Sequence, residues 1–205
     1  MNINRSGVYR IIKPMSNGCD SIINLSIYIS PLMTIVDGDS IYFNIISNEY
    51  PRTVEVTYLG MSPEENNEYR DTISIPPFFV KDTIIYNVVS IGSGAFGSSY
   101  NLKWVNLPNT INVIGDISFN NCHNLKNLIL PNSLNMIGYA AFENTELENL
   151  YIQTQTPPFV HWYSGINQSV NLYVLCGTKQ LYQTNNSWNH INKYLRYNII
   201  WTELY

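Results

Sequence analysis

The chain has 205 residues, of which 45% are hydrophobic, and this is enough for a packed core in one domain or two small ones. Charged residues make up only 13%, the formal net charge is −4, and Lys and Arg are scattered along the chain. No basic surface is therefore expected to neutralise phosphates, which argues against nucleic acid as a partner. No stretch reaches the roughly 18 continuous apolar residues of a membrane-spanning helix.

Residues 1–38 form a leader of uncertain structure. Arg5, Arg10 and Lys13 precede an apolar segment at 22–36, which would suit a poor signal sequence, but polar residues and Pro31 interrupt that segment and no small-residue cleavage site follows it. We favour the alternative, a β-rich or loosely packed leader.

Residues 39–90 are rich in β-branched and aromatic residues with partial alternation, which is typical of strands. We expect a small antiparallel β-rich N-terminal cap made of segments 41–45, 54–58, 72–75 and 83–88. A loop at 61–71 carries Glu64, Glu65 and Glu68, and we expect it to be solvated rather than to bind a metal ion.

Residues 91–153 contain one unit written three times. Its Ile-Gly pair begins at residues 91, 114 and 137, with steps of 114 − 91 = 23 and 137 − 114 = 23, and Phe96, Phe119 and Phe142 keep the same step. Each unit continues into a Leu-x-x-apolar-x-apolar strand pattern. A fixed period in the low twenties predicts a leucine-rich solenoid, in which the aliphatic positions and the Phe rings of successive coils stack into two buried columns.

Small residues punctuate each predicted coil. Gly92, Gly115 and Gly138 are expected where the chain bends sharply into a short helical turn, at a position that accepts positive φ. Pro108 and Pro131 are expected to end their strands, because proline offers no N–H to the ladder.

Residues 154–205 are expected to form a C-terminal capping segment. Residues 155–158 break the repeat, 170–174 predict one more strand, and 179–196 have helical tendencies. Trp162 and Trp188 are expected to fill this cap, because large aromatic side chains seal an open apolar end. The predicted fold class is thus an α/β solenoid: a short leucine-rich repeat stack of about three 23-residue coils between two caps.

The sequence holds no pattern that predicts catalysis. Cys19, Cys122 and Cys176 form no C-x-x-C pair, and the three His residues align with no Ser or Cys motif. Cys122 is expected as a buried core thiol, while Asp116 and Glu143 are expected to cap their own turns. We therefore expect no enzyme, no catalytic residue, no metal site and no cofactor.

The repeat unit resembles the BspA-type leucine-rich repeat family. The resemblance rests on Ile-Gly-x-x-Ala-Phe at 91–96 and 137–142, on the related run at 114–119, on Cys122-His-Asn-Leu125 and on the Leu-Pro pairs that end at Pro108 and Pro131. It extends to about residues 39–195, with Ser118 in place of the usual Ala. It implies a cell-surface or secreted, extracellular protein used in adhesion or recognition of a host protein or glycan, without chemistry of its own.

In the strand pattern the apolar residues face the core, so the residues between them line an exposed, concave sheet. Two columns are expected there, one of Trp104, Asn127 and Asn149 and one of Asn106, Ile129 and Tyr151, with Gln153 beyond them. Aromatic rings beside amides suit peptide backbones or the faces of sugars, so we predict that these residues bind a protein or glycan.

Two other interpretations of this face stay open. It could pack against a cap or against a second copy of the chain, which would make the protein a structural or self-assembling homo-oligomer, or it could be inert surface. A monomer with an open face would favour recognition, and an oligomer that buries Trp104 and Tyr151 would favour assembly.

Overall fold

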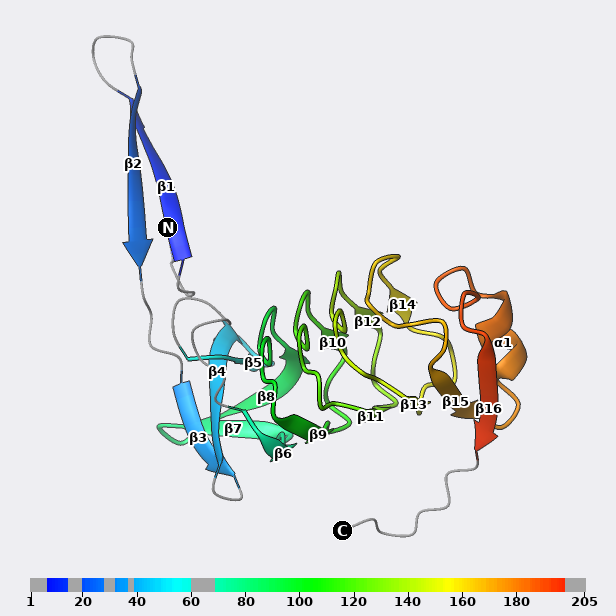
Figure 1. Cartoon of the computed structure of the whole chain (residues 1–205). Helices are drawn as coiled ribbons and strands as arrows, with labels where there is room; N and C mark the ends of the chain where they lie inside the picture. Colours follow the sequence, from blue (N-terminus) through cyan, green and yellow to red (C-terminus); the bar gives the residue numbers. More distant parts are fainter. Residues whose placement is uncertain (1–6, 15–19, 28–31, 37–38, 60–68, 198–205) are drawn as a thin grey trace.

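The computed structural model describes residues 7–14, 20–27, 32–36, 39–59 and 69–197. Over these residues the chain forms an elongated stack of strands, with one short helix at the C-terminal end (Figure 1). A single cluster of buried side chains runs from Ile41 at one end of the stack to Ile191 at the other. The protein is β-rich and contains parallel sheets with almost no helix.

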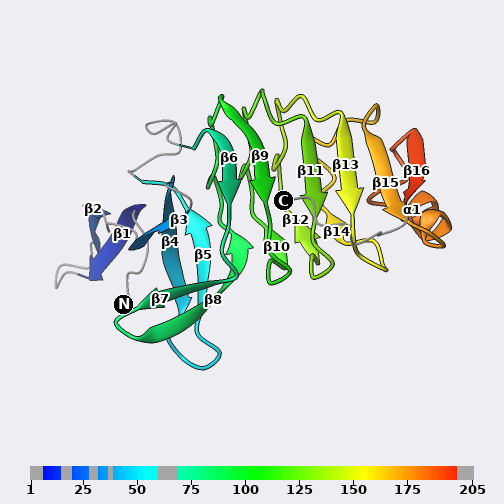
Figure 2. The same cartoon turned by 90° about the horizontal axis from the view of Figure 1, so that it is seen from below.

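One side of the stack consists of six parallel strands, which we call the repeat strands (Figure 2). β6 pairs with β9, and β11, β13, β15 and β16 form a four-stranded sheet in that order; β9 lies beside β11. Their bounds are Asp71–Ser74 for β6, Leu102–Asn106 for β9, Asn127–Leu130 for β11, Asn149–Ile152 for β13, Asn171–Leu175 for β15 and Lys193–Tyr197 for β16. β11 and β13 alternate buried aliphatic residues with outward ones, so in these strands a period of two residues sets which side chains reach solvent.

The other side is an eight-stranded sheet. In spatial order its strands are β14 (Phe159–Val160), β12 (Met136–Ile137), β10 (Val113–Ile114), β8 (Ile84–Ile91), β5 (Thr53–Thr57), β4 (Asp39–Ser47) and β3 (Leu32–Val36), and β7 (Phe78–Lys81) pairs with β8 in addition. Neighbours from β14 to β5 run parallel, whereas β3, β4 and β7 are antiparallel to their partners.

Of the four segments expected in an antiparallel cap, β4 and β5 do pair antiparallel with each other, whereas β5 pairs parallel with β8 and β6 pairs parallel with β9. Val56 of β5 lies opposite Ile91, and Ile73 of β6 lies opposite Val105. These aliphatic residues continue the buried aliphatic rows of the repeats, and parallel pairing buries both of them in the core. Parallel pairing also crosses both predicted segment boundaries, and the division of the chain at residues 90 and 153 stays a prediction.

The described part of the leader is β-rich, which agrees with the expectation of a β-rich or loosely packed leader. β1 (Gly7–Pro14) and β2 (Asp20–Ile27) form an antiparallel hairpin that stands away from the stack (Figure 1). The predicted Glu64, Glu65 and Glu68 loop and Cys19 lie outside the described residues.

The three phenylalanines of the repeat form one continuous pile, as predicted. Phe96 and Phe119 have ring centroids 5.0 Å apart at an interplanar angle of 6°, and Phe119 and Phe142 have centroids 5.4 Å apart at 4°. Tyr69 extends the pile with its ring 4.7 Å from Phe96, and the three Phe side chains are fully buried.

The turns that hold this pile are not helical, which corrects the expectation of a short helical turn. They are successive tight turns in which Ile117, Asn121 and Ala140, among other residues, adopt positive φ angles of 48°, 61° and 48°. A right-handed helix excludes such angles.

The repeat glycines are required by close packing of adjacent coils and not, as predicted, by a positive φ angle. Gly92, Gly115 and Gly138 do not adopt positive φ. A Cβ atom at Gly115 would lie 2.8 Å from the Ser93 nitrogen and 2.9 Å from the Ile91 oxygen, both backbone atoms of the preceding coil. Glycine is needed because adjacent coils approach too closely for any side chain.

The C-terminal segment is less helical than predicted. α1 spans Lys179–Thr184, and residues 193–197 form β16, where Leu195 lies opposite Tyr173. Strand pairing with β15 overrides the local helical pattern because it satisfies the backbone of the last strand in the stack. Trp188 is buried as predicted, and its indole N–H donates a hydrogen bond to the Pro158 carbonyl at 2.8 Å.

The prediction for Trp162 is wrong, because its side chain is 86% exposed. Trp162 follows Tyr139 by one repeat step, 162 − 139 = 23, and Tyr139 follows Asp116 by the same step. All three occupy a solvent-facing position at the start of a turn, so the place of Trp162 in the repeat keeps it out of the core.

Candidate functional site: the face of the repeat strands

The predicted site residues lie on the outward face of the repeat strands. Strand register places Asn127 opposite Asn149 and Ile129 opposite Tyr151, so these four residues adjoin one another as the two columns predicted. None of the four is fully buried. We call the face formed by β9, β11, β13 and β15 the sheet face.

One row of the sheet face is a ladder of amides. Asn149 donates from Nδ2 to Oδ1 of Asn127 at 2.7 Å, and Asn171 donates from Nδ2 to Oδ1 of Asn149 at 2.9 Å. Among the described residues, no partner is recorded for the amide hydrogens of Asn127 or for the amide oxygen of Asn171. The ladder therefore holds three side chains in fixed orientations and offers hydrogen-bonding groups at both ends.

A second row is apolar and aromatic. The Tyr151 and Tyr173 rings stack with centroids 4.3 Å apart at 14°, next to Ile129. Burial, followed by the neighbouring Tyr173, raises the pKa of the Tyr151 hydroxyl above its ordinary value. Tyr151 thus stays protonated at neutral pH and can donate a hydrogen bond.

Trp104 and Asn106 lie at the β9 end of the sheet face. The Trp104 indole N–H donates to Oδ1 of Asn106 at 2.6 Å, and Asn106 donates from Nδ2 to Oγ of Ser74 on β6 at 3.0 Å. This chain of hydrogen bonds fixes the orientation of the half-buried indole.

Gln153 lies just past the end of β13, beside a hollow of about 490 Å³. Asn132, Asn135 and Thr154 line the hollow with it. All its lining side chains are uncharged and none titrates near neutral pH, so the hollow provides hydrogen bonds and no acid or base.

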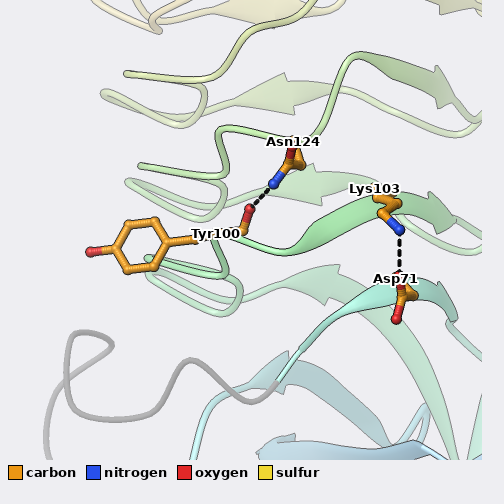
Figure 3. A network of polar contacts seen from close by, with 4 residues as sticks. All are labelled: Asp71, Tyr100, Lys103 and Asn124. Atoms are coloured by element: carbon orange, nitrogen blue, oxygen red, sulfur yellow. Dashed lines mark hydrogen bonds and ion pairs between the residues drawn. The ribbon is translucent and has the colours of Figure 1, made fainter.

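Charged residues border the sheet face in opposite pairs. Lys103 forms an ion pair with Asp71 (Figure 3), with Nζ 2.7 Å from Oδ1, and Lys126 forms one with Glu148, with Nζ 3.1 Å from Oε1. The Lys103 ammonium, first by its hydrogen bond and then by its charge, holds the pKa of the Asp71 carboxyl below its ordinary value. Both pairs are exposed and contribute little to stability, but they leave the border with no net charge.

Other polar side chains connect successive turns. Asn124 donates from Nδ2 to the Tyr100 carbonyl at 2.6 Å, while the Tyr100 ring points away from the coils (Figure 3). Asp116 accepts a hydrogen bond from the Tyr139 N–H at 2.7 Å, and Glu143 accepts one from Asn120 at 3.3 Å. The prediction that both carboxylates cap their own turns is wrong, because each bonds to a neighbouring coil.

Cysteine, histidine and acidic side chains are the residue types that hold metal ions in proteins. Cys122 is a buried core thiol, as predicted; burial raises its pKa to about 12, and its sulfur donates to the Phe96 carbonyl at 3.1 Å. In the part of the chain that the structure describes, no three His, Cys, Asp or Glu side chains gather as a metal ion would require.

Two residues of the sheet face were missed from the sequence. Asn171 and Tyr173 extend the amide and aromatic rows onto β15. The signal was present, because Asn-Leu-Tyr at 171–173 repeats Asn-Leu-Tyr at 149–151 with a step of 171 − 149 = 22.

Residues 80–159 match the family described as the BspA type leucine-rich repeat region (6 copies). Over these residues the resemblance seen in the sequence is confirmed. No curated protein matches the chain.

Several solved structures are similar to parts of the chain at low identity. A leucine-rich cell surface protein from Faecalibacterium prausnitzii has a TM-score of 0.47 and 21% identity, over 72% of this chain and 45% of that one. A leucine-rich repeat protein from Bacteroides ovatus gives 0.44 and 22%, over 69% and 37%. The pneumococcal vaccine antigen PcpA gives 0.41 and 16%, over 71% and 41%. The chain spans less than half the length of each of these proteins. In the described residues, no helix has the length and apolarity to cross a membrane.

Proposed function

We propose that this protein is a non-enzymatic recognition module that binds a partner protein through the sheet face. The binding residues in this proposal are Trp104, Asn106, Asn127, Ile129, Asn149, Tyr151 and Gln153, extended by Asn171 and Tyr173. The match of residues 80–159 to the BspA type leucine-rich repeat region supports a role in protein interaction or adhesion. Placement at the cell surface or in the extracellular space is part of the proposal.

The observation that carries the proposal is the pre-organisation of the sheet face. The amide ladder and the stacked Tyr151 and Tyr173 rings are held in place before any partner arrives. Side chains that are already ordered lose little rotamer entropy on binding, and half-exposed Tyr and Trp rings are common anchors of protein interfaces. The scarcity of charge on this face predicts an affinity that depends only weakly on salt.

The test combines a binding screen with a double variant. Extracellular-matrix and cell-surface proteins, together with a glycan array, are probed with the intact chain and with Trp104→Ala/Tyr151→Ala. The matched control is Tyr100→Ala, which removes an exposed tyrosine from a turn and leaves the sheet face intact. We expect the intact chain and the control to bind one protein class. The double variant should lose that binding while remaining folded, with a lower unfolding midpoint because the Tyr151–Tyr173 stack is broken.

Four results would contradict the proposal. Unchanged protein binding by the double variant would place the interface elsewhere, and unfolding of that variant would make Trp104 and Tyr151 structural. Binding on the glycan array alone would replace the protein partner by a glycan. If the intact chain has the molecular mass of a dimer in solution and the double variant that of a monomer, the self-assembly alternative would be favoured.

A further inference from the structure

A cluster of aromatic side chains lies on the turn edge of the stack, apart from the sheet face. It consists of Tyr139 in one coil and His161, Trp162 and Tyr163 in the next, and we call it the turn-edge cluster. The Tyr139 ring lies 5.3 Å from His161 and 5.2 Å from Tyr163, and the Trp162 ring lies 5.6 Å from His161 and 5.7 Å from Tyr163. Four rings from two coils therefore form one contiguous group.

The cluster is exposed to solvent although it consists of aromatic side chains, which are buried to a large extent in most proteins. Trp162 is 86% exposed, Tyr139 43% and Tyr163 38%, whereas Trp188 in the same half of the chain is fully buried. Grouped surface aromatics mark interaction sites more often than single ones do. The repeat accounts for the position of Trp162 in the fold, but not for the presence of an indole at that position.

Polar groups surround the rings and hold one of them in place. The Tyr163 hydroxyl donates a hydrogen bond to Oε1 of Glu143, whose Oε2 accepts from Nδ2 of Asn120 at 3.3 Å. The hydrogen bond from Tyr163 to Glu143 is the main reason that the pKa of this tyrosine is raised. Tyr163 therefore keeps its proton and a fixed ring orientation at neutral pH.

His161 supplies a further donor. Its Nδ1 accepts a hydrogen bond from the Tyr163 backbone N–H at 3.2 Å, so the neutral ring carries its proton on Nε2. For Nε2 no partner is recorded among the described residues, and it is available to a ligand.

We infer that the turn-edge cluster binds a neutral carbohydrate, with a pyranose ring stacked on Trp162 and its hydroxyl groups bonded by Glu143 and His161. A sugar ring has one apolar face of C–H groups, which packs on aromatic faces, and a rim of hydroxyls, which carboxylate and imidazole groups recognise. Neither Lys nor Arg belongs to the cluster, and Glu143 would repel phosphate or sulfate, so anionic glycans and nucleic acids do not fit.

This site is independent of the sheet face, and the two can succeed or fail separately. It is open and engages one or two sugar units, so its affinity is expected to be weak, on the order of 1 mM for a single sugar. A longer neutral oligosaccharide, or several copies of the protein on one surface, would raise the apparent affinity.

The experiment measures saturation-transfer NMR and titration calorimetry of the whole chain with cellotetraose, chitotetraose and mannotetraose. We expect one or more of these neutral probes to bind, with at least a tenfold loss in Trp162→Ala and an affinity that NaCl does not change. Glu143→Gln should weaken binding less, because it keeps the hydrogen-bonding shape. Tyr100→Ala is the matched control, because it removes a partly exposed tyrosine that stacks on His123 at 5.5 Å and is not part of the cluster.

Trp162 is so exposed that its removal should leave the unfolding midpoint unchanged, which separates lost binding from lost folding. The Trp104→Ala/Tyr151→Ala variant should bind the sugar as the intact chain does. Failure of all three probes to bind, equal binding by Trp162→Ala, or a strong dependence on NaCl would each overturn the inference. Loss of protein binding rather than sugar binding in Trp162→Ala would reassign the cluster to a protein interface.

Discussion

Phe119 provides the sharpest test of the stacked core. Its ring is fully buried between Phe96 and Phe142, with centroid separations of 5.0 and 5.4 Å. Phe119→Ala removes the buried ring, leaves a cavity and breaks both stacked pairs. Truncation of a buried phenylalanine destabilises a protein by about 3–5 kcal/mol, and each aromatic pair contributes about 0.5–1.5 kcal/mol of this beyond area burial.

Phe119→Leu separates the two contributions. Leucine keeps most of the apolar volume but stacks with neither ring, so its expected effect is about 1–3 kcal/mol, the sum of the two lost pairs. The free energy of unfolding is measured for both variants by urea titration followed by circular dichroism, and the slope is checked for two-state behaviour. A loss below about 1 kcal/mol for Phe119→Ala would refute the reasoning, as would equal losses for the two variants.

Three further predictions follow from single contacts. Gly115→Ala should lower the free energy of unfolding by about 1–3 kcal/mol, because the new methyl group meets backbone of the preceding coil; an unchanged urea midpoint would show that the coils can separate. Cys122 should resist alkylation at pH 8 while the exposed Cys176 reacts, as peptide mass spectrometry can measure, because burial raises the pKa of Cys122 to about 12; equal labelling of both thiols in the folded protein would contradict this. The pKa of Asp71 should lie below 3.8 and rise toward it in Lys103→Met, as an NMR titration can follow. Since the folded pKa is the lower one, the contribution of Asp71 to stability is present above pH 3.8 and is lost as the pH falls through the folded value.

The repeat positions were open to prediction because each obeys a fixed stride. A Phe every 23 residues can be buried only if the rings stack, and the pile of Phe96, Phe119 and Phe142 follows from that geometry. The strand pattern placed Asn127 beside Asn149 and Ile129 beside Tyr151, although the step there is 149 − 127 = 22 residues because the third coil is one residue shorter. The 23-residue step, extended from Tyr139 past residue 153, also predicts that Trp162 faces solvent.

The sequence by itself determined the stride, the inward and outward alternation of each repeat strand and the family to which the repeats belong. These are properties of local spacing, and local spacing is visible in one dimension. Only the tertiary structure decided that β5, β6 and β8 pair in parallel, that Leu195 lies in a strand, and that Gly115 is required by an approach of two coils. Each of these three features depends on which distant segment lies beside the residue in the folded chain. A backbone hydrogen bond or a buried aliphatic contact is made with that neighbouring segment, so the flanking residues in the sequence do not decide it.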